Sequence, residues 1–412
     1  MYQNIYHAAA GLCLDNKDED ITATISGLLP IMLEDNGRSF SALTTENITQ
    51  FRFQKVSKLP KECGQTATAN MDPIANFEAT WKQFDTHYAF FEARKINWKD
   101  VYARYRPKVT PQTTANELYL ILSNMLGELN DRHVILDDET GKEFRGGLGS
   151  VVGPWFESYA RNQKGAENAI DYINAKMSPY KALVVDNYMD GSTGTAGQGQ
   201  ILWGRLKGNI GYIRLDSFSS FDARDGYKYH KAALDAAIDA ALLDTKGVKA
   251  FIIDMRFNLG GNDGLGLALM SRFADQKRLA YTKQAQATVG FTALQKISVV
   301  PSPHRFGGKV AILIGNVTVS AGENFTIASL PFANVIRVGE TTAGALSDVL
   351  MKPLPNGWEI GISNEIFRTA DGRDIEAIGI KPDVAVPNHF APQTLSIKRD
   401  IILETAMSKL KP

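Results

Sequence analysis

The fold of this chain is decided by the stretch KVAILIGNVTVSAGE, residues 309–323. Its first half, KVAILIG, is a short apolar run that predicts a buried strand. A polar bend follows, and Ser320 stands where a helix should begin. A serine at such a bend presents its hydroxyl at a chain reversal, near the backbone N–H groups that a helix start leaves unpaired. Ser320 is therefore a candidate nucleophile.

The same stretch also has a purely structural interpretation. Ser320 and Glu323 form the pattern S-x-x-E, a capping box that pairs the free N–H groups of a helix start. The stretch also differs from the G-x-S-x-G nucleophile elbow, because Thr318 occupies the position of the first glycine. The local sequence leaves both roles open, so the rest of the chain has to decide between them.

Composition bounds the class of protein. The chain has 412 residues, enough for roughly two or three domains. Its content of 44% hydrophobic and 22% charged residues is ordinary for a soluble globular protein. The formal net charge is zero, so no global field attracts the chain to nucleic acid or to an anionic membrane. The apolar runs end well before the about 20 residues that a membrane span needs.

The cysteines and the N-terminus say little about redox state or compartment. Cys13 and Cys63 could form one disulfide or remain two free thiols. No C-x-x-C pair or Cys/His cluster indicates zinc, so we expect no metal and no cofactor. Residues 1–20 lack a basic n-region and predict no signal peptide. A processed chain would look the same, so the location is periplasmic or secreted if a signal peptide was removed, and otherwise cytoplasmic.

The N-terminal third of the chain divides into two regions of different pattern. Residues 1–66 alternate polar and apolar side chains, as in SFSALTTENITQFRFQ, and predict a β-rich domain. Residues 67–136 carry apolar side chains at helical spacing and predict a helical subdomain. His133 lies at its end, in LNDRHV, where a helix should meet a strand. A single histidine is often structural, so its role depends on further evidence.

The remaining chain predicts a connection and a core. Residues 137–208 form a glycine-rich connecting region, with strands expected at LGSVVG (148–153) and ALVVDNYM (182–189) and a flexible loop at GSTGTAGQG. From 209 to 412, strands alternate with helices, which predicts an α/β core with largely parallel strands. One amphipathic helix is expected over Thr394–Leu410.

Two features of this core follow strands and should therefore lie at the same edge of the sheet, where active sites of α/β cores are found. One is Ser320, and the other is the turn RFNLGG after KAFIIDM. Gly260 and Gly261 would let the backbone point an N–H group into a cleft. Together with the N–H of Ala321, this turn would form a two-donor oxyanion hole. The alternative is a glycine turn without a role in chemistry.

Seven motifs in residues 74–390 resemble those of the S41 family of serine peptidases, which includes the C-terminal processing peptidases and the tricorn core protease. Each motif is weak alone, but all occur in the family's order. They are the aromatic helix with WKDVYARYRP, LNDRHV, NIGYIRLDSF, DMRFNLGGN, SAGE, VGETTAG and IEAIGIKPDV. The resemblance implies a crotonase-like (ClpP/crotonase) layered α/β core, with a helical subdomain and a small N-terminal β domain, and a serine-type peptidase.

The family uses two catalytic schemes, and the resemblance favours one of them. The processing peptidases use a lysine base after the G-E-x-T-x-G motif, but here no lysine occurs between Ser320 and Lys352. The tricorn-like scheme uses a histidine and a glutamate, which map by similarity onto His133 and Glu376. Ser320 would then be the nucleophile and His133 the general base, while Glu376 would orient the imidazole.

The chain departs from the family pattern in two places. Arg132 stands where the tricorn-like scheme has a serine that links the histidine to the glutamate. Glu376 must therefore reach His133 directly, or through another group or water. The alternatives are that Glu376 is a surface carboxylate or a salt-bridged one, with Arg132 as a possible partner. The second departure concerns residues 141–200, which are too few for the PDZ domain that many members insert there, so we predict no PDZ domain.

The leading prediction is a serine endopeptidase or carboxypeptidase-like enzyme that acts on peptides or unfolded chains, without a nucleic-acid partner. One alternative is a non-enzymatic ligand- or peptide-binding protein on the same fold, since a fold does not fix a function. Another is an esterase or acyl transferase that uses the same groups. A binding protein has no need of Ser320, His133, Glu376 and paired glycines together, so their combination favours the enzyme. The peptide specificity and oligomeric state stay open.

Overall fold

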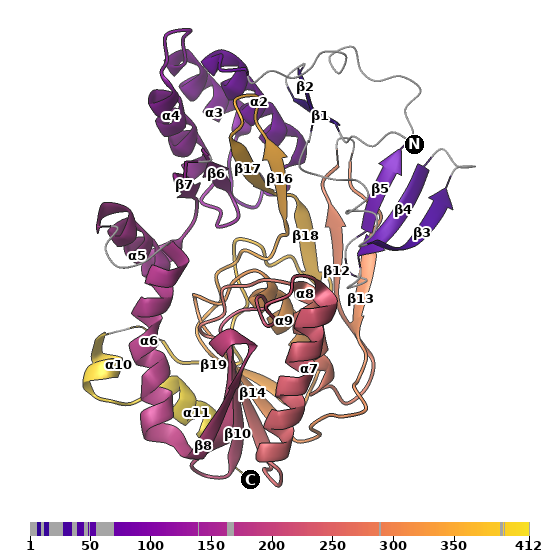
Figure 1. Cartoon of the computed structure of the whole chain (residues 1–412), viewed down its shortest axis with the longest axis vertical. Helices are drawn as coiled ribbons and strands as arrows, with labels where there is room; N and C mark the ends of the chain where they lie inside the picture. The colour runs from indigo at the N-terminus through magenta and orange to yellow at the C-terminus, as the bar shows by residue number, and fades with distance from the viewer. Residues whose placement is uncertain are drawn as a thin grey trace. The chain divides into compact units, whose positions relative to one another are not determined.

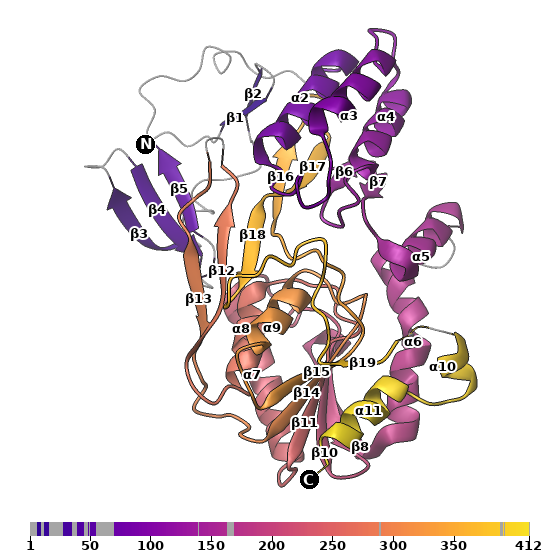
Figure 2. The same ribbon diagram turned by 180° about the vertical axis from the view of Figure 1, so that it is seen from behind.

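The computed structural model describes most of the chain (Figures 1 and 2). The described residues are 6–9, 12–15, 28–34, 39–44, 48, 50–54, 70–138, 140–162, 169–287, 290–387, 390 and 392–411. The chain divides into two compact units. The first comprises Met1–Gly147, Gln284–Ala293 and Ser347–Ile366, and the second comprises Leu148–Lys283, Leu294–Leu346 and Phe367–Pro412.

Helices and an antiparallel sheet build the core of the first unit. Its helices are α2 (Pro73–His87), α3 (Trp98–Tyr105), the 3₁₀ turn η3 (Arg106–Lys108) and α4 (Ala115–Gly127). Its sheet has the order β16-β17-β6-β7, formed by Val349–Pro353, Glu359–Ser363, Ile135–Asp137 and Glu143–Arg145. The predicted apolar stripe of α2 is confirmed, because Phe77 and Phe84 are fully buried. A capping box between Thr114 and Glu117 begins α4.

The N-terminal residues that the structure describes form small antiparallel ladders. Strand β1 (Tyr6–Ala9) pairs with β2 (Leu12–Asp15), and a second sheet has the order β3-β4-β5 (Leu28–Glu34, Ser39–Thr44 and Gln50–Gln54). Cys13 lies in β2, whereas Cys63 and the expected boundary near residue 66 fall outside the described residues. The possible disulfide therefore stays a prediction.

A seven-stranded sheet with the order β19-β15-β14-β11-β10-β9-β8 forms the centre of the second unit (Figure 2). The neighbours from β10 to β19 are parallel, whereas the pairs β8–β9 and β9–β10 are antiparallel. The predicted α/β core with largely parallel strands is thus present. Along the chain the strands are β8 (Met189–Ala196), β9 (Ile201–Leu206), β10 (Ile210–Leu215), β11 (Ala250–Asp254), β14 (Lys309–Ile314), β15 (Val335–Gly339) and β19 (Val384–Ala385).

The second unit also contains helices. They are α5 (Gly149–Asn162), α6 (Ala169–Tyr188), α7 (Tyr227–Asp244), α8 (Asp263–Ser271), α9 (Ala321–Ser329), α10 (Pro392–Ser396) and α11 (Ile401–Lys409), with a 3₁₀ turn η4 (Gly197–Gly199). A further sheet has the order β13-β12-β18, formed by Gln295–Val299, Arg278–Ala285 and Glu365–Thr369. No helix in the described part of the chain is long and apolar enough to cross a bilayer.

Two expectations for the connecting region are wrong. The segments LGSVVG and ALVVDNYM are almost entirely helical, in α5 and α6. The segment GSTGTAGQG lies in strand β8 and the 3₁₀ turn η4 rather than forming a loop. The valine pairs suggested strands, but the buried residues of α6 follow the helical period, with steps of three or four positions apart from the adjacent pair Leu183 and Val184. They are Ile173, Met177, Tyr180, Leu183, Val184 and Tyr188. Periodicity over the whole segment therefore outweighs the β propensity of the valine pairs.

The expected C-terminal helix is interrupted. Helix α10 ends at Ser396 and α11 begins at Ile401, with Lys398 between them at a φ of 52°. Asp400 caps α11 by accepting a hydrogen bond from the N–H of Leu403 (3.0 Å). A single amphipathic pattern thus covers two helices, because Asp400 is an N-cap residue rather than a position on a continuous helix face.

Candidate active site

Ser320 occupies the strained bend between β14 and α9. Its φ is 57° and its ψ is −128°, a backbone conformation that is unfavourable for residues other than glycine. Ser320 is the N-cap residue of α9, but its side chain makes no capping hydrogen bond. The capping-box interpretation is therefore wrong. The hydroxyl is presented at the start of the helix without being used to hold the helix together.

Glu323 has a different role from the one that a capping box gives it. Its fully buried carboxylate accepts hydrogen bonds from the hydroxyl of Thr342 (2.5 Å) and from the N–H groups of Gly344 and Ala345 (both 2.8 Å). Hydrogen bonds to a charged group are stronger than neutral ones. Glu323 thus fixes the loop 342–346 against the first turn of α9.

Two adjacent residues of this loop, Ala345 and Leu346, are hydrogen-bonded to Ser320 and to Glu376 respectively. The N–H of Ser320 donates to the carbonyl of Ala345 (2.9 Å), and the N–H of Leu346 donates to Oε2 of Glu376 (2.8 Å). Glu376 is only 3% exposed. The structure therefore brings Glu376 into the immediate surroundings of the serine bend, and the alternative of a surface carboxylate does not apply.

The glycine turn after β11 contacts the serine directly. A Cβ atom placed on Gly260 would lie 2.6 Å from Cβ of Ser320 and 3.1 Å from its Oγ. Gly260 and Gly261 have φ values of 94° and 131°, so both positions need glycine for conformation as well as for space. The two features that the sequence places at strand ends are thus in contact.

The backbone donors of this turn are not equivalent. The N–H of Gly260 donates to Oδ1 of Asn258 (2.9 Å) and is occupied. Among the described residues, neither the N–H of Gly261 nor that of Ala321 donates a hydrogen bond. Gly261 is exposed, whereas Ala321 is the first residue of α9, where a helix leaves its N–H groups unpaired. The free donors near Ser320 are therefore those of Gly261 and Ala321.

Asn258, which the sequence reading did not single out, organises both turns. Its side chain is fully buried, accepts from Gly260 and donates to the carbonyl of Leu215 (3.2 Å). Its backbone carbonyl accepts from the N–H of Val319, next to Ser320 (3.3 Å). Its position in the motif DMRFNLGGN was the available signal, but a turn asparagine has many simpler explanations.

His133 lies in the first unit, on the turn between α4 and β6. Asp131 shapes this turn, because its Oδ1 accepts the N–H of His133 (3.0 Å) and its main-chain carbonyl accepts the N–H of Val134 (3.2 Å). The Asp131 carboxylate is itself held by the hydroxyl of Tyr88 (2.8 Å) and the guanidinium of Arg94 (3.3 Å). Asp131 therefore fixes the backbone of the histidine, a role that the sequence reading missed.

The imidazole of His133 is buried, and its environment favours the neutral form. Burial lowers its pKa below the ordinary 6.5, while the nearby carboxylates of Asp131 and Asp348 oppose that shift only in part. Its Nδ1 has no hydrogen-bond partner among the residues that the structure describes. A neutral imidazole is the form that can accept a proton. His133 and Ser320 belong to different units, so their separation stays a prediction.

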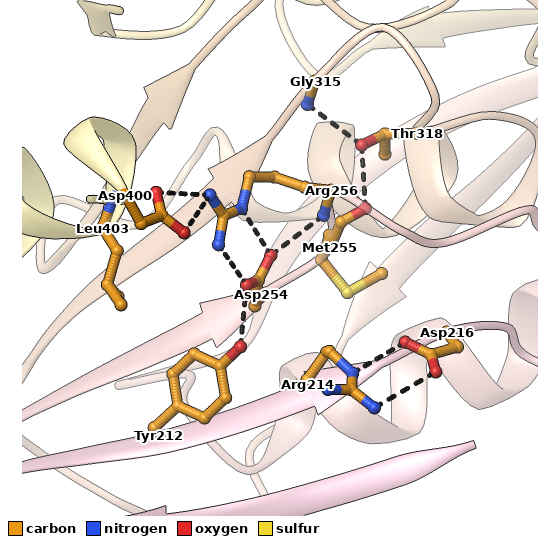
Figure 3. Close-up of polar contacts among 10 residues, drawn as sticks. All are labelled: Tyr212, Arg214, Asp216, Asp254, Met255, Arg256, Gly315, Thr318, Asp400 and Leu403. Atoms are coloured by element: carbon orange, nitrogen blue, oxygen red, sulfur yellow. Dashed lines mark hydrogen bonds and ion pairs between the residues drawn. The ribbon is translucent and has the colours of Figure 1, made fainter. Parts of the chain in front are cut away.

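A buried charge cluster surrounds Arg256, two residues before Asn258 (Figure 3). The guanidinium of Arg256 is fully buried and pairs with the carboxylates of Asp254 (2.6 Å) and Asp400 (2.8 Å). Burial alone would lower the pKa of Arg256, but the two carboxylates outweigh it and raise that pKa above its ordinary value. The hydroxyl of Tyr212 completes the cluster by donating to Asp254 (2.8 Å). No group of His, Cys, Asp and Glu suited to a metal ion occurs in the described part of the chain.

Two family models match this chain. Residues 209–386, which include the serine bend and the glycine turn, match peptidase family S41. Residues 73–127, which cover α2 to α4, match the tricorn protease C1 domain.

Curated relatives are C-terminal processing proteases. The carboxy-terminal processing protease CtpA of Bacillus subtilis (strain 168) is 30% identical over 177 residues, which are 43% of this chain and 34% of CtpA. The carboxyl-terminal-processing protease of Picosynechococcus sp. is 26% identical over 178 residues, 43% of this chain and 39% of that protein. The match thus spans little more than a third of the length of these relatives.

Solved structures extend the likeness over more of the chain. A candidate peptidase from Parabacteroides merdae has a TM-score of 0.67 and 27% identity, and the likeness covers 83% of this chain and 98% of that one. Mature CPAF, solved with lactacystin, has a TM-score of 0.57 at 13% identity over 82% of this chain and 97% of its own, which shows a shared mixed α/β fold. The segment that holds the serine bend and the glycine turn is therefore similar to peptidase family S41 and to the C-terminal processing proteases.

Proposed function

We propose that this chain is a serine peptidase that cleaves peptide bonds through an acyl-enzyme on Ser320. The observation that carries the proposal is the bend at Ser320. A strained serine at a helix start, whose hydroxyl caps nothing, lies against a glycine turn with free N–H donors. Strain of this kind costs about 1–3 kcal/mol and persists where function requires it.

The oxyanion hole is formed by the N–H groups of Gly261 and Ala321. Gly260 contributes space rather than a donor, because its own N–H is bonded to Asn258. When Ser320 attacks the peptide carbonyl, the carbonyl oxygen becomes an oxyanion that these donors stabilise. Loss of one such donor typically costs about 2.7–4 kcal/mol of transition-state stabilisation.

His133 is the general base. In its neutral form it takes the proton from the Ser320 hydroxyl as the oxygen attacks, and it returns that proton to the leaving amine when the peptide bond breaks. In the second half of the reaction it takes a proton from the water that attacks the acyl-enzyme. It then gives that proton to Oγ of Ser320 as the bond between Oγ and the acyl carbon breaks and the acid product leaves. The lowered pKa of His133 supports this role, since the imidazole remains neutral at pH 7.

Glu376 orients His133. Its burial next to the loop that holds Ser320, and the unpaired Nδ1 of His133 among the described residues, support this assignment. Oε2 of Glu376 accepts the N–H of Leu346, which holds the carboxylate beside the residue that follows Ala345. In the processing peptidases a lysine base follows the G-E-x-T-x-G motif, whereas here Ala345 and Leu346 follow Gly344. The backbone carbonyl of Ala345 accepts the N–H of Ser320, and the backbone N–H of Leu346 donates to Glu376.

The substrates we propose are peptides or unfolded proteins. We also assign the second unit to the crotonase-like class, which the mixed sheet with helix α9 after β14 supports. Rates of hydrolysis on matched ester and amide substrates separate this proposal from an esterase or acyl transferase. A peptidase must cleave the amide in a reaction that requires Ser320.

Fluorophosphonate labelling, followed by peptide mass spectrometry, tests the proposal. Wild type should be labelled at Ser320, Ser320→Ala should remain unlabelled, and His133→Ala should react about 100-fold more slowly or worse, because the base is lost. Ser408→Ala, which removes an exposed serine on α11, is the control and should behave as wild type. A folded wild type that stays unlabelled contradicts the proposal and favours a binding protein on the same fold.

A further inference from the structure

The glycine turn is positioned by the residues that follow β10. The N–H of Leu259 donates to the carbonyl of Asp216 (3.1 Å), and the carbonyl of Gly260 accepts from the N–H of Phe218 (2.7 Å). The carbonyl of Phe218 in turn accepts from the N–H of Asn262 (2.9 Å). Any displacement of residues 215–218 therefore moves the turn that carries the N–H of Gly261.

Asp216 is held in place by charges from two elements. Its carboxylate, 9% exposed, pairs with Nε of Arg214 (2.9 Å) and with Nζ of Lys181 (3.0 Å). Figure 3 shows the Arg214–Asp216 pair beside the Arg256 cluster. Arg214 lies two residues away on the same segment, so it cannot tie that segment to another part of the unit. Lys181 comes from α6 and makes that connection.

Helix α6 also packs against both turns of the site. Met177 and Tyr180 lie in one buried cluster with Phe257, which begins the glycine turn, and with Val317, which precedes Ser320. Nζ of Lys181 lies 5.6 Å from the ring centre of Phe257. The lysine is thus next to this cluster, and its side chain is only 13% exposed.

We propose that Lys181 is a positioning residue for the oxyanion hole: its ion pair with Asp216 fixes the backbone of residues 257–261 from helix α6. The proposal rests on the proposed function for its catalytic consequence. Lys181 is no candidate for the base itself, since its ammonium is bound to Asp216. A helix in the connecting region, rather than the core sheet alone, therefore sets the geometry of the donors.

The substitution Lys181→Met in the full chain tests the positioning role of Lys181. Lys176→Met is the matched control, because Lys176 is an exposed lysine on the same helix. Hydrogen exchange followed by mass spectrometry should show faster exchange of the peptide that covers 257–262 in Lys181→Met only. With a peptide substrate, kcat should fall about tenfold or more while KM stays within about twofold, since misplaced donors affect the transition state. Lys181→Arg should recover most of both properties because it restores the ion pair.

The exchange measurement needs no activity, so the two proposals can fail separately. Unchanged exchange over 257–262 in Lys181→Met overturns the positioning role, whatever the turnover. Faster exchange in a protein whose wild type shows no Ser320-dependent turnover leaves the positioning role standing and removes the proposed function. If Lys181→Met lowers the melting temperature severely, Lys181→Gln, which keeps a hydrogen-bond donor without the charge, serves for the same comparison.

Discussion

Ser320 combines a strained backbone with a hydroxyl that contributes nothing to the helix it begins. We expect Ser320→Gly to be more stable than Ser320→Ala by about 1–2 kcal/mol, since glycine adopts a positive φ without strain. Both variants lack the hydroxyl, so their difference reports the backbone alone. Urea denaturation of the two proteins measures it, and an alanine variant as stable as the glycine variant would contradict strain at this position.

The lowered pKa of His133 predicts the pH dependence of the reaction. A base must be neutral, and burial holds the pKa of this imidazole below 6.5. We expect the acid limb of kcat/KM to be centred below pH 6.5. Asp348→Asn removes a charge that raises this pKa, so the acid limb should move to still lower pH. An acid limb centred at or above pH 6.5 in the wild type would exclude His133 as the base.

The candidate residues were accessible from the sequence because they belong to short motifs with chemical meaning. Ser320, Gly261 and Ala321 follow from a strand that ends before a helix and from paired glycines. Asn258 and Asp131 were missed, because their roles depend on hydrogen bonds to backbone groups that only folding brings near. The choice between the N–H groups of Gly260 and Gly261 likewise required the position of the Asn258 side chain.

At the scale of elements, helix α11 is anchored to the site through Asp400. This residue caps the helix and pairs with Arg256, two residues before Asn258. We expect Asp400→Asn to cost about 3–5 kcal/mol, because it leaves the buried guanidinium with one carboxylate fewer. Chemical denaturation measures the loss.

Arg399→Gln provides the comparison for Asp400. Arg399 pairs with Glu404 on the surface of the same region, with 61% of its side chain exposed. Exposed pairs contribute about 0–1 kcal/mol, so this variant should be nearly as stable as wild type. Equal losses for both variants would mean that the buried cluster is no anchor.

Helices and strands were predictable from the sequence where a single hydrophobic pattern, either helical spacing or a short apolar run, covered the whole element. The helical spacing of apolar residues in α2 and the apolar strands β11 and β14 matched their patterns. Helices α5 and α6 were mistaken for strands because Val151-Val152 and Val184-Val185 have high β propensity over a short window. Strand β8 was mistaken for a loop because it is rich in glycine, although Gly194 lies against Trp203, where a Cβ would fall 2.1 Å from the indole.

At the scale of the whole molecule, the alternation of strands and helices predicted the core, but not the division into two units. The chain leaves and re-enters the first unit, which collects Met1–Gly147, Gln284–Ala293 and Ser347–Ile366. Such long-range assembly has no local signature, because each segment satisfies its own periodicity wherever it packs.

The first unit should be the acid-sensitive one. Burial, helped by the charge of Lys352, lowers the pKa of His87 to about 4, and His133 in the same unit is also lowered. The unfolded chain therefore binds more protons than the folded unit once the pH drops below 6.5, and stability is lost from there towards pH 4. We expect His87→Gln to remove part of this loss, roughly 1–2 kcal/mol between pH 7 and 4.5.

Hydrogen exchange at several pH values locates this effect. Peptides from α2 and α4 should lose protection on acidification earlier than peptides from β11 and β14, and His87→Gln should delay that loss. If the core strands of the second unit open first, the histidines do not govern the acid response.

The central claim is that Ser320 reacts with the help of His133 and of the donors at Gly261 and Ala321. A crystal structure of the fluorophosphonate adduct tests it most directly. The account predicts a phosphonyl oxygen about 2.7–3.1 Å from both N–H nitrogens, with Nε2 of His133 within about 3.2 Å of an oxygen at the modified serine. An adduct on another residue, or one whose phosphonyl oxygen points away from Gly261 and Ala321 while His133 contacts nothing at Ser320, would contradict it.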